Sequence, residues 1–172
     1  ENDICVIAPQ WAPIRSMTKK LITLLPNVRF DAPALSPFHG QQDSFWLIVS
    51  KLALTEPSGR LLSVRSRWAN EILNHLSDVH HHTRELTAKN LLKVINSFQS
   101  ETRVGTEYLK ECFEFMLDEL DLDLVSDVAL KEQFNLFFEK ATSNIENNNG
   151  QYEDSVVALK SFFKESTGIV VN

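Results

Sequence analysis

The side chains best suited to hold a metal lie near the end of one predicted helix. His75, Asp78 and His82 follow one another at spacings of three and four residues, which places all three on one helical face. Imidazole nitrogens and a carboxylate oxygen are ordinary zinc ligands, so this stripe could bind zinc if a fourth ligand joined it. The histidine triplet at 80–82 cannot do so by itself, because successive helical residues point about 100° apart.

The end of a helix explains the same residues without a metal. The helix dipole leaves partial negative charge at the C-terminus, which favours histidine there, and neighbouring carboxylates pair with it locally. We therefore assign no metal to this stripe and expect folding to survive chelators, since a structural zinc would contribute stability that chelation removes. The sequence predicts no cofactor either.

The acidic run at 118–123 resembles a calcium loop only in its composition. An EF-hand loop needs oxygen ligands at set positions, a glycine at its sharp turn and a glutamate at its end. A loop that opened at Asp121 would place Ser126 at the glycine position. We therefore predict a solvated helix end instead of a calcium site. Its leucines are expected to turn inward: Leu120, Leu122 and Leu124.

Enzyme signatures are absent from the sequence. A phosphate-binding loop needs glycines before a Gly-Lys pair, a dinucleotide site needs three spaced glycines, and many hydrolases carry a serine between two glycines. The five glycines of the chain form none of these patterns. Cys112 falls on the apolar side of a predicted helix, which is a poor setting for a nucleophile. The sequence therefore predicts a protein that is not an enzyme.

Charge is divided unevenly along the chain. Residues 1–103 hold every arginine and contain 12 Lys and Arg against 9 Asp and Glu, a net charge of +3. Residues 104–172 contain 5 Lys against 14 Asp and Glu, and the whole chain has a formal net charge of −6. Such polarity concerns surfaces and partners, not catalysis. The positive segment is weak beside a typical nucleic-acid-binding domain.

Three arginines of the helix expected over 59–81 are the first candidates for contact with a partner. Arg60 and Arg67 share its polar stripe, and Arg65 lies about 140–160° around the helix from them. Guanidinium groups pair well with carboxylates and phosphates, so these residues could bind an acidic protein or a nucleic acid.

The next helix, expected over 84–99, adds Arg84 together with Lys89 and Lys93. Trp11, which lies between two prolines, is the aromatic candidate for a docking contact. With the three arginines of the preceding helix, Arg84 and Trp11 complete the predicted partner-binding set.

These observations favour a helical protein–protein interaction or scaffold domain whose partner presents an acidic surface or peptide. The alternative is a nucleic-acid-associated helical module that uses the same arginines. The basic half could also pack on the acidic half of the same copy or of a neighbouring copy. The sequence leaves the oligomeric state open.

Apolar residues recur at three- and four-residue spacing over most of the chain, which predicts an all-α single domain of about seven helices. The expected ranges are 14–25, 44–54, 59–81, 84–99, 106–120, 126–145 and 151–165. Short connections predict that the last four pack as antiparallel neighbours, in a bundle or in stacked helical pairs. The fifth is apolar over more than half its circumference, so we expect it at the centre of the core with the phenylalanines at 134–138.

All six prolines precede residue 58, so we expect 1–42 to be irregular apart from the first helix, and 43–172 to form the helical body. Phe30, Leu35 and Phe38 are expected to pin the irregular segment to the core.

Two distant cysteines, Cys5 and Cys112, are expected to be reduced thiols, which favours an intracellular protein of the nucleus or cytoplasm. No apolar run approaches the ~20 residues that span a bilayer, so no membrane association is expected. The chain does not begin with methionine, so we expect it to be a segment of a larger protein.

Overall fold

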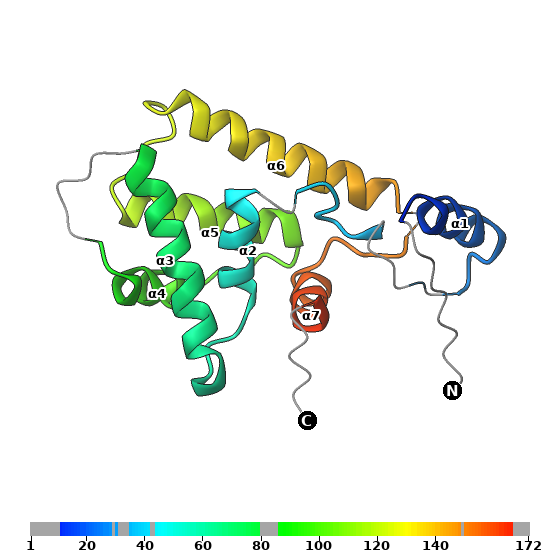
Figure 1. Ribbon diagram of the computed structural model, residues 1–172, viewed down its shortest axis with the longest axis horizontal. Helices are drawn as coiled ribbons and strands as arrows, with labels where there is room; N and C mark the ends of the chain where they lie inside the picture. Colours follow the sequence, from blue (N-terminus) through cyan, green and yellow to red (C-terminus); the bar gives the residue numbers. More distant parts are fainter. Residues whose placement is uncertain are drawn as a thin grey trace.

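The computed structural model describes residues 11–28, 30, 35–41, 44–79, 86–148 and 150–166 (Figure 1). This part of the chain contains seven α-helices and no strand, which confirms the predicted all-α fold. They are α1 (Trp11–Leu24), α2 (Phe45–Leu54), α3 (Leu62–Val79), α4 (Ala88–Ser97), α5 (Gly105–Glu119), α6 (Val128–Glu146) and α7 (Val156–Ser166). A 3-10 turn over Gly59–Leu61 leads into α3. Of the helices described, none combines the length and the apolar character needed to cross a lipid bilayer.

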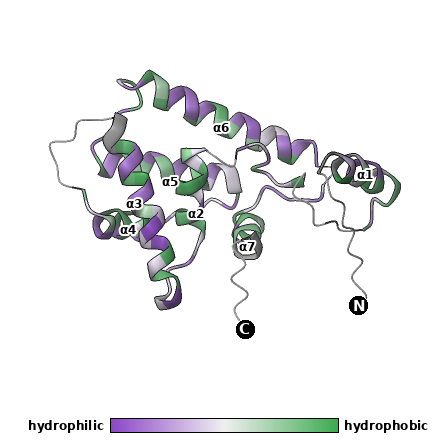
Figure 2. Ribbon diagram, viewed as in Figure 1, coloured by the Kyte–Doolittle hydropathy of each residue, from purple (hydrophilic) through white to green (hydrophobic). Residues whose placement is uncertain are grey.

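The most apolar helix, α2, lies at the centre of the fold. Trp46, Val49 and Leu52 have no exposed surface, and the helix contacts α3, α4, α5, α6 and α7. Figure 1 shows α2 running antiparallel to α3. In Figure 2, α2 is mostly green, whereas purple and green alternate along α6. A helix that is apolar around most of its circumference is expected to be enclosed by protein, and α2 is buried except at the half-buried Ile48, Lys51 and Ala53.

Aromatic rings join α2, α5 and α6 into one core. Phe113 of α5 stacks on Trp46 of α2, with ring centroids 4.9 Å apart. The same ring contacts Phe134, Phe137 and Phe138 of α6 at centroid distances of 6.3, 5.8 and 5.5 Å. The predicted core of the fifth helix and its phenylalanine partners is thus confirmed. The structure also places α2 in this core, in keeping with the burial that its nearly all-apolar run at 45–49 predicts.

The last helices do not all pack as antiparallel chain neighbours. Figure 1 shows α5 and α6 running in opposite directions, as predicted, but α7 is seen end-on and crosses them. Helix α7 packs on α5 and α2, and its buried residues are Leu159 and Phe163. Hydrogen bonds tie the residues just before α7 to the start of α5. This tie directs the chain away from the end of α6 before α7 begins.

That tie caps α5 from a distant part of the sequence. The N-cap residue of α5, Val104, offers no side-chain acceptor, and Asp154 supplies one. Oδ1 of Asp154 accepts a hydrogen bond from the backbone N–H of Thr106 at 2.8 Å, and Oδ2 accepts one from its hydroxyl at 2.5 Å. The backbone N–H of Gly105 donates to the Asp154 carbonyl at 3.3 Å. A carboxylate at a helix N-terminus satisfies free N–H groups and complements the dipole.

Gly105→Ala is expected to lower the free energy of unfolding by about 1–3 kcal/mol. A Cβ there would lie 2.6 Å from Cδ1 of Leu159 and 2.8 Å from Oδ1 of Asp154, so the α5–α7 junction would have to shift. Urea denaturation measures the loss. Gly59→Ala is the matched control, because a Cβ there meets nothing within 4 Å and stability should change by less than about 0.5 kcal/mol. Equal stability of the two variants would mean that the junction yields freely.

The connection between α1 and α2 is pinned as predicted, but in two places. Phe38 enters the main core, whereas Leu35 and Ile22 of α1 form a separate small cluster against which Phe30 packs. Asn144 of α6 donates its amide to two carbonyls of the connection, at 3.0 and 3.1 Å. The part of the connection over 37–39 therefore lies against α6 and the main core.

The leucines of the acidic run after α5 turn inward, as predicted. Leu120 and Leu122 are buried, and Leu124 packs partly against the core. Asp121 adopts a left-handed backbone conformation with φ 57°, which aspartate tolerates better than most residues. The run therefore turns the chain from α5 into α6.

Candidate partner-binding groove

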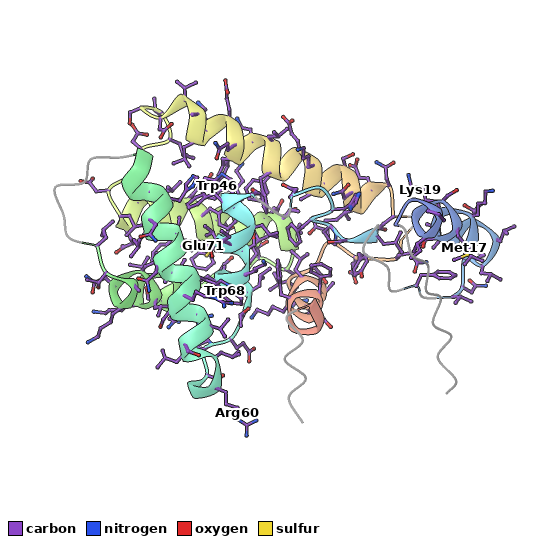
Figure 3. The ribbon with its side chains drawn as sticks, in the orientation of Figure 1. Met17, Lys19, Trp46, Arg60, Trp68 and Glu71 are labelled. Atoms are coloured by element: carbon purple, nitrogen blue, oxygen red, sulfur yellow. The ribbon has the colours of Figure 1, made fainter. Side chains whose placement is uncertain are left out.

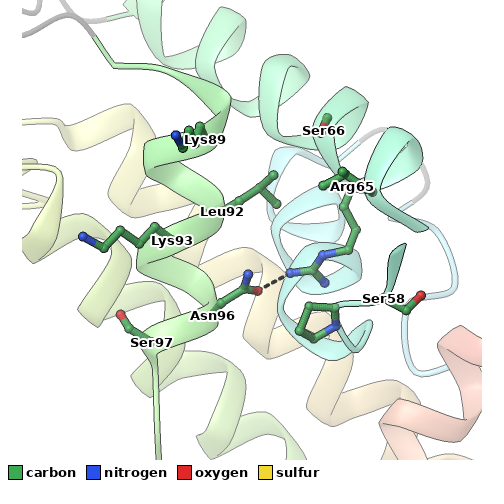
Figure 4. Close-up of a pocket in the computed structure, with 10 residues that line it drawn as sticks. Ser58, Arg65, Ser66, Lys89, Leu92, Lys93, Asn96 and Ser97 are labelled. Carbon is green, nitrogen blue, oxygen red and sulfur yellow. Dashed lines mark hydrogen bonds between the residues drawn. The ribbon is translucent and has the colours of Figure 1, made fainter. Parts of the chain in front are cut away.

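A groove of about 590 Å³ opens between the start of α3 and the facing side of α4 (Figure 4). This volume lies within the usual range of ligand sites in proteins. The described residues that line it are Pro57, Ser58, Leu62, Arg65 and Ser66 on one wall and Lys89, Leu92, Lys93, Asn96 and Ser97 on the other.

Arg65 forms part of the inner wall and is buried, with 3% of its surface exposed. Its Nη1 donates to the carbonyl oxygens of Leu52, at 2.8 Å, and of Thr55, and its Nη2 donates to Oδ1 of Asn96 at 2.5 Å. Burial lowers the pKa of Arg65, but a guanidinium stays charged in proteins. Its positive charge therefore lies at the C-terminal end of α2, where helix carbonyls lack helical donors.

Arg65 thus joins α2, α3 and α4. This placement corrects the surface role that the sequence analysis gave it, because the guanidinium is already engaged by three acceptors within the fold. Figure 4 shows the side chain reaching from α3 across to Asn96 of α4.

Two lysines of α4 supply the accessible positive charge at this groove. Lys89 and Lys93 are exposed, and Figure 4 shows them projecting from α4 away from Arg65. Leu62, on the opposite wall, has 60% of its surface exposed, whereas Leu92, on the same wall as the lysines, is buried. None of the described residues that line the groove is acidic. The groove therefore combines an apolar surface with unopposed positive charge.

Two of the other predicted site residues, Arg60 and Arg67, do not line the groove. Arg60 and Arg67 are exposed on the polar stripe expected for them, and Figure 3 shows Arg60 pointing into solvent near the start of α3. Arg60, in the 3-10 turn, and Arg67, on α3, are the exposed pair that we call the second basic surface. Arg84 lies outside the described residues, and Trp11 is the first residue of α1 but its side chain is not among those described.

Part of this arrangement could have been found from the sequence. Trp68 and Ala69, three and four residues after Arg65, are buried, so the helical spacing already places Arg65 on the core side of α3. Lys89 and Lys93 lie one helical turn apart and hence on one face of α4. No local pattern could show that this face of α4 lies beside the start of α3.

The predicted histidine stripe falls only partly within the described residues. His75 stacks on Phe45 of α2, with ring centroids 4.6 Å apart and ring planes 19° apart. The side chain of Asp78 and the whole of His82 lie outside the described residues. Among the side chains that the structure does describe, no group of three or more His, Cys, Asp and Glu is placed to hold a metal ion. Folding without a required metal stays a prediction.

Cys112 is a free thiol whose burial on α5 raises its pKa to about 12. The thiolate is the reactive form, so it should be scarce at neutral pH. In a Cys5→Ser variant we expect Cys112 to resist a disulfide reagent in the native protein and to react rapidly in urea. Rapid labelling of the native variant would contradict this burial.

The same burial predicts a loss of stability in alkali. The folded state keeps the Cys112 thiol protonated up to about pH 12, whereas the unfolded thiol ionises near its ordinary value of 9.0. Between these values the unfolded state binds fewer protons, so the free energy of unfolding falls as the pH rises. Cys112→Ala should flatten this part of the profile, as urea denaturation at several pH values would measure.

The described side chains of the groove supply ammonium groups, hydroxyls, an amide, a guanidinium and apolar surface, but no thiol, imidazole or carboxylate. Such a set can hold an acidic ligand by charge and by burial of an apolar side chain.

No protein-family model matches the chain, and neither the curated proteins nor the solved structures contain a significant match to it.

Proposed function

We propose that this chain is a non-catalytic protein–protein interaction domain that binds an acidic segment of another protein in the groove between α3 and α4. The observation that supports this proposal is the combination of exposed Leu62 with Lys89 and Lys93 in a groove whose described lining contains no acidic residue. Complementary charge across an interface speeds association and selects the partner, while buried apolar surface supplies affinity.

The shape of the site favours a polypeptide segment as the occupant. A groove between two helices can take a helix or an extended strand whose apolar side chain anchors it. Here Leu62, with most of its surface exposed, offers the apolar contact. Lys89 and Lys93, one helical turn apart, can meet two carboxylates that flank the anchor.

A nucleic-acid strand is the second candidate for the same lysines and for Arg60 and Arg67. Its support is the exposure of all four cations on neighbouring helices. The chain as a whole has a net charge of −6, however, which opposes binding to a phosphate backbone. We therefore place an acidic protein first.

A fluorescein-labelled peptide of alternating glutamate and leucine is a suitable probe. We expect Lys89→Glu/Lys93→Glu to weaken its binding at least about tenfold, with slower association and a smaller dependence on salt. Lys19→Glu/Lys20→Glu makes the same change of charge at exposed residues of α1, away from the groove, and should bind nearly as the wild type does. Fluorescence anisotropy at several salt concentrations measures the affinities, and circular dichroism verifies that both variants fold.

If charge reversal at either lysine pair weakened peptide binding equally, only the net charge of the protein would matter, and the groove would not be the binding site. Charge reversal at Arg60 and Arg67 tests the second basic surface. If only this double variant lost peptide binding, the binding site would lie there and not in the groove. Steeply salt-sensitive binding of unrelated DNA or RNA, abolished by the groove reversal, would assign the groove to nucleic acid.

A further inference from the structure

The turn that joins α5 to α6 carries the opposite charge to the groove between α3 and α4. We call residues 118–128 the acidic turn, which contains five Asp and Glu residues and no Lys or Arg. Four of its carboxylate residues are exposed: Asp118, Glu119, Asp121 and Asp123. In Figure 1 the acidic turn lies at the upper edge of the molecule, and the start of α3 lies at the lower edge. None of its residues lines the groove, so a copy of the chain does not fill its own groove with this turn.

The acidic turn also exposes two apolar side chains. Val125 has 76% of its surface exposed and Val128 has 64%, although the leucines between the same carboxylates are buried or half-buried. The fold makes little use of these two valines, because most of their surface meets solvent. They lie among carboxylates in the sequence, so the acidic turn offers an apolar anchor together with negative charge.

Hydrogen bonds within the acidic turn fix the backbone that carries the valines. Oδ1 of Asp123 accepts a hydrogen bond from the backbone N–H of Val125 at 2.8 Å, and the Asp123 carbonyl accepts one from the hydroxyl of Ser126 at 3.0 Å. Oδ1 of Asp127 accepts the backbone N–H of Leu130 at 2.9 Å and thereby caps α6. A segment that is already ordered loses less conformational entropy when it binds, so this turn is a better ligand than a free strand of the same sequence.

The groove presents the complementary set of groups. Lys89 and Lys93 are exposed cations, and Leu62 has 60% of its surface exposed on the facing wall. A valine of the acidic turn can cover Leu62 while neighbouring carboxylates meet the two ammonium groups. Burial of apolar surface and complementary charge then act together, as at other protein interfaces.

We infer that the groove of one copy of this chain binds the acidic turn of a second copy. The inference rests on the proposed function and names a partner for the same groove. The contact joins two different surfaces, so each pair of copies keeps one free groove and one free acidic turn. Such a head-to-tail contact repeats, and it builds a ring or an open chain of copies.

Sedimentation velocity of the whole chain over a range of concentrations, at 150 mM salt, tests the contact. This salt concentration screens the long-range repulsion between copies that each have a net charge of −6. A contact between one turn and one groove is small and therefore weak, so the average mass should rise above that of one chain between roughly 10 and 500 µM. A wild-type protein that stays monomeric up to about 500 µM would overturn the inference.

Two double variants each remove one side of the contact. Lys89→Glu/Lys93→Glu reverses the groove, Val125→Lys/Val128→Lys replaces the anchor of the acidic turn with positive charge, and each should stay monomeric over the same range. The matched control for the turn is Leu24→Lys/Val157→Lys, which makes the same kind of change at residues of α1 and α7 that are 73% and 78% exposed. This control and Lys19→Glu/Lys20→Glu should associate as the wild type does. Equal loss of association in the controls would reveal a general effect of charge and overturn the inference.

A mixture of the two monomeric variants gives the sharpest test. The groove variant keeps its acidic turn and the turn variant keeps its groove, so equal amounts of the two should form a complex of two chains. Both variants keep a net negative charge, so net charge does not draw them together. The absence of a complex in the mixture would show that the turn and the groove do not meet, and it would overturn the inference.

The labelled peptide of glutamate and leucine separates this inference from the proposed function. Binding of the peptide in the groove without any self-association of the wild type would overturn the second copy as partner and leave the proposed function standing. The absence of both peptide binding and self-association would overturn the two together. Val125→Lys/Val128→Lys, whose groove is unchanged, should bind the peptide as the wild type does.

Discussion

Alanine in place of Phe113 or Phe137 is expected to lower the free energy of unfolding by about 3–5 kcal/mol, the usual result of deleting a buried ring. The two side chains are 0% and 1% exposed. Phe113 has aromatic neighbours on both α2 and α6, so its removal leaves a cavity between helices that cannot close without moving the others. Phe137 also stacks on Phe38, so its loss loosens the connection before α2 too.

Urea denaturation followed by circular dichroism measures this loss directly. Val125→Ala is the control, because that side chain is 76% exposed and its truncation should change stability by less than about 0.5 kcal/mol. Losses below about 1 kcal/mol at both phenylalanines would place the core elsewhere.

The positions of the helices could be predicted because they depend on local spacing. Helix α5 was expected over 106–120 and is found over Gly105–Glu119, and α2 was expected over 44–54 and is found over Phe45–Leu54. The first helix begins earlier than expected, since Pro13 lies in its first turn, where a missing N–H breaks no helical hydrogen bond. A proline signals a helix boundary only when its position within the turn is known.

The arrangement of the helices could not be predicted, because it depends on contacts between distant residues. Nothing in the sequence near Val104 shows that Asp154 caps α5, yet this tie turns α7 across α5 and α6. The groove depends in the same way on the start of α3 lying beside α4. The sequence shows that Lys89 and Lys93 carry positive charge, but only the fold shows which apolar residues lie next to them.

Arg65→Met should lower the free energy of unfolding by about 2–4 kcal/mol. The substitution keeps much of the apolar stem but removes the donors to the carbonyls of Leu52 and Thr55. A buried acceptor that loses its donor costs about 1–3 kcal/mol, and two carbonyls are affected here. Arg65→Lys should recover only part of the loss, because one ammonium cannot reproduce the two-armed reach of a guanidinium to α2 and α4.

Arg67→Met is the matched control, since it makes the same substitution two residues away on the exposed side of α3 and should be nearly neutral. Urea denaturation of both variants compares them, and a difference below about 0.5 kcal/mol would show that the guanidinium does not hold α2 and α4 together. Arg65 also lines the groove, so any weaker peptide binding in Arg65→Met would mix lost contact with a loosened wall. Lys89 and Lys93 are exposed and have no such structural role, so variants at these two residues test whether the groove binds the peptide. Variants at Arg65 test what holds the two walls of the groove together.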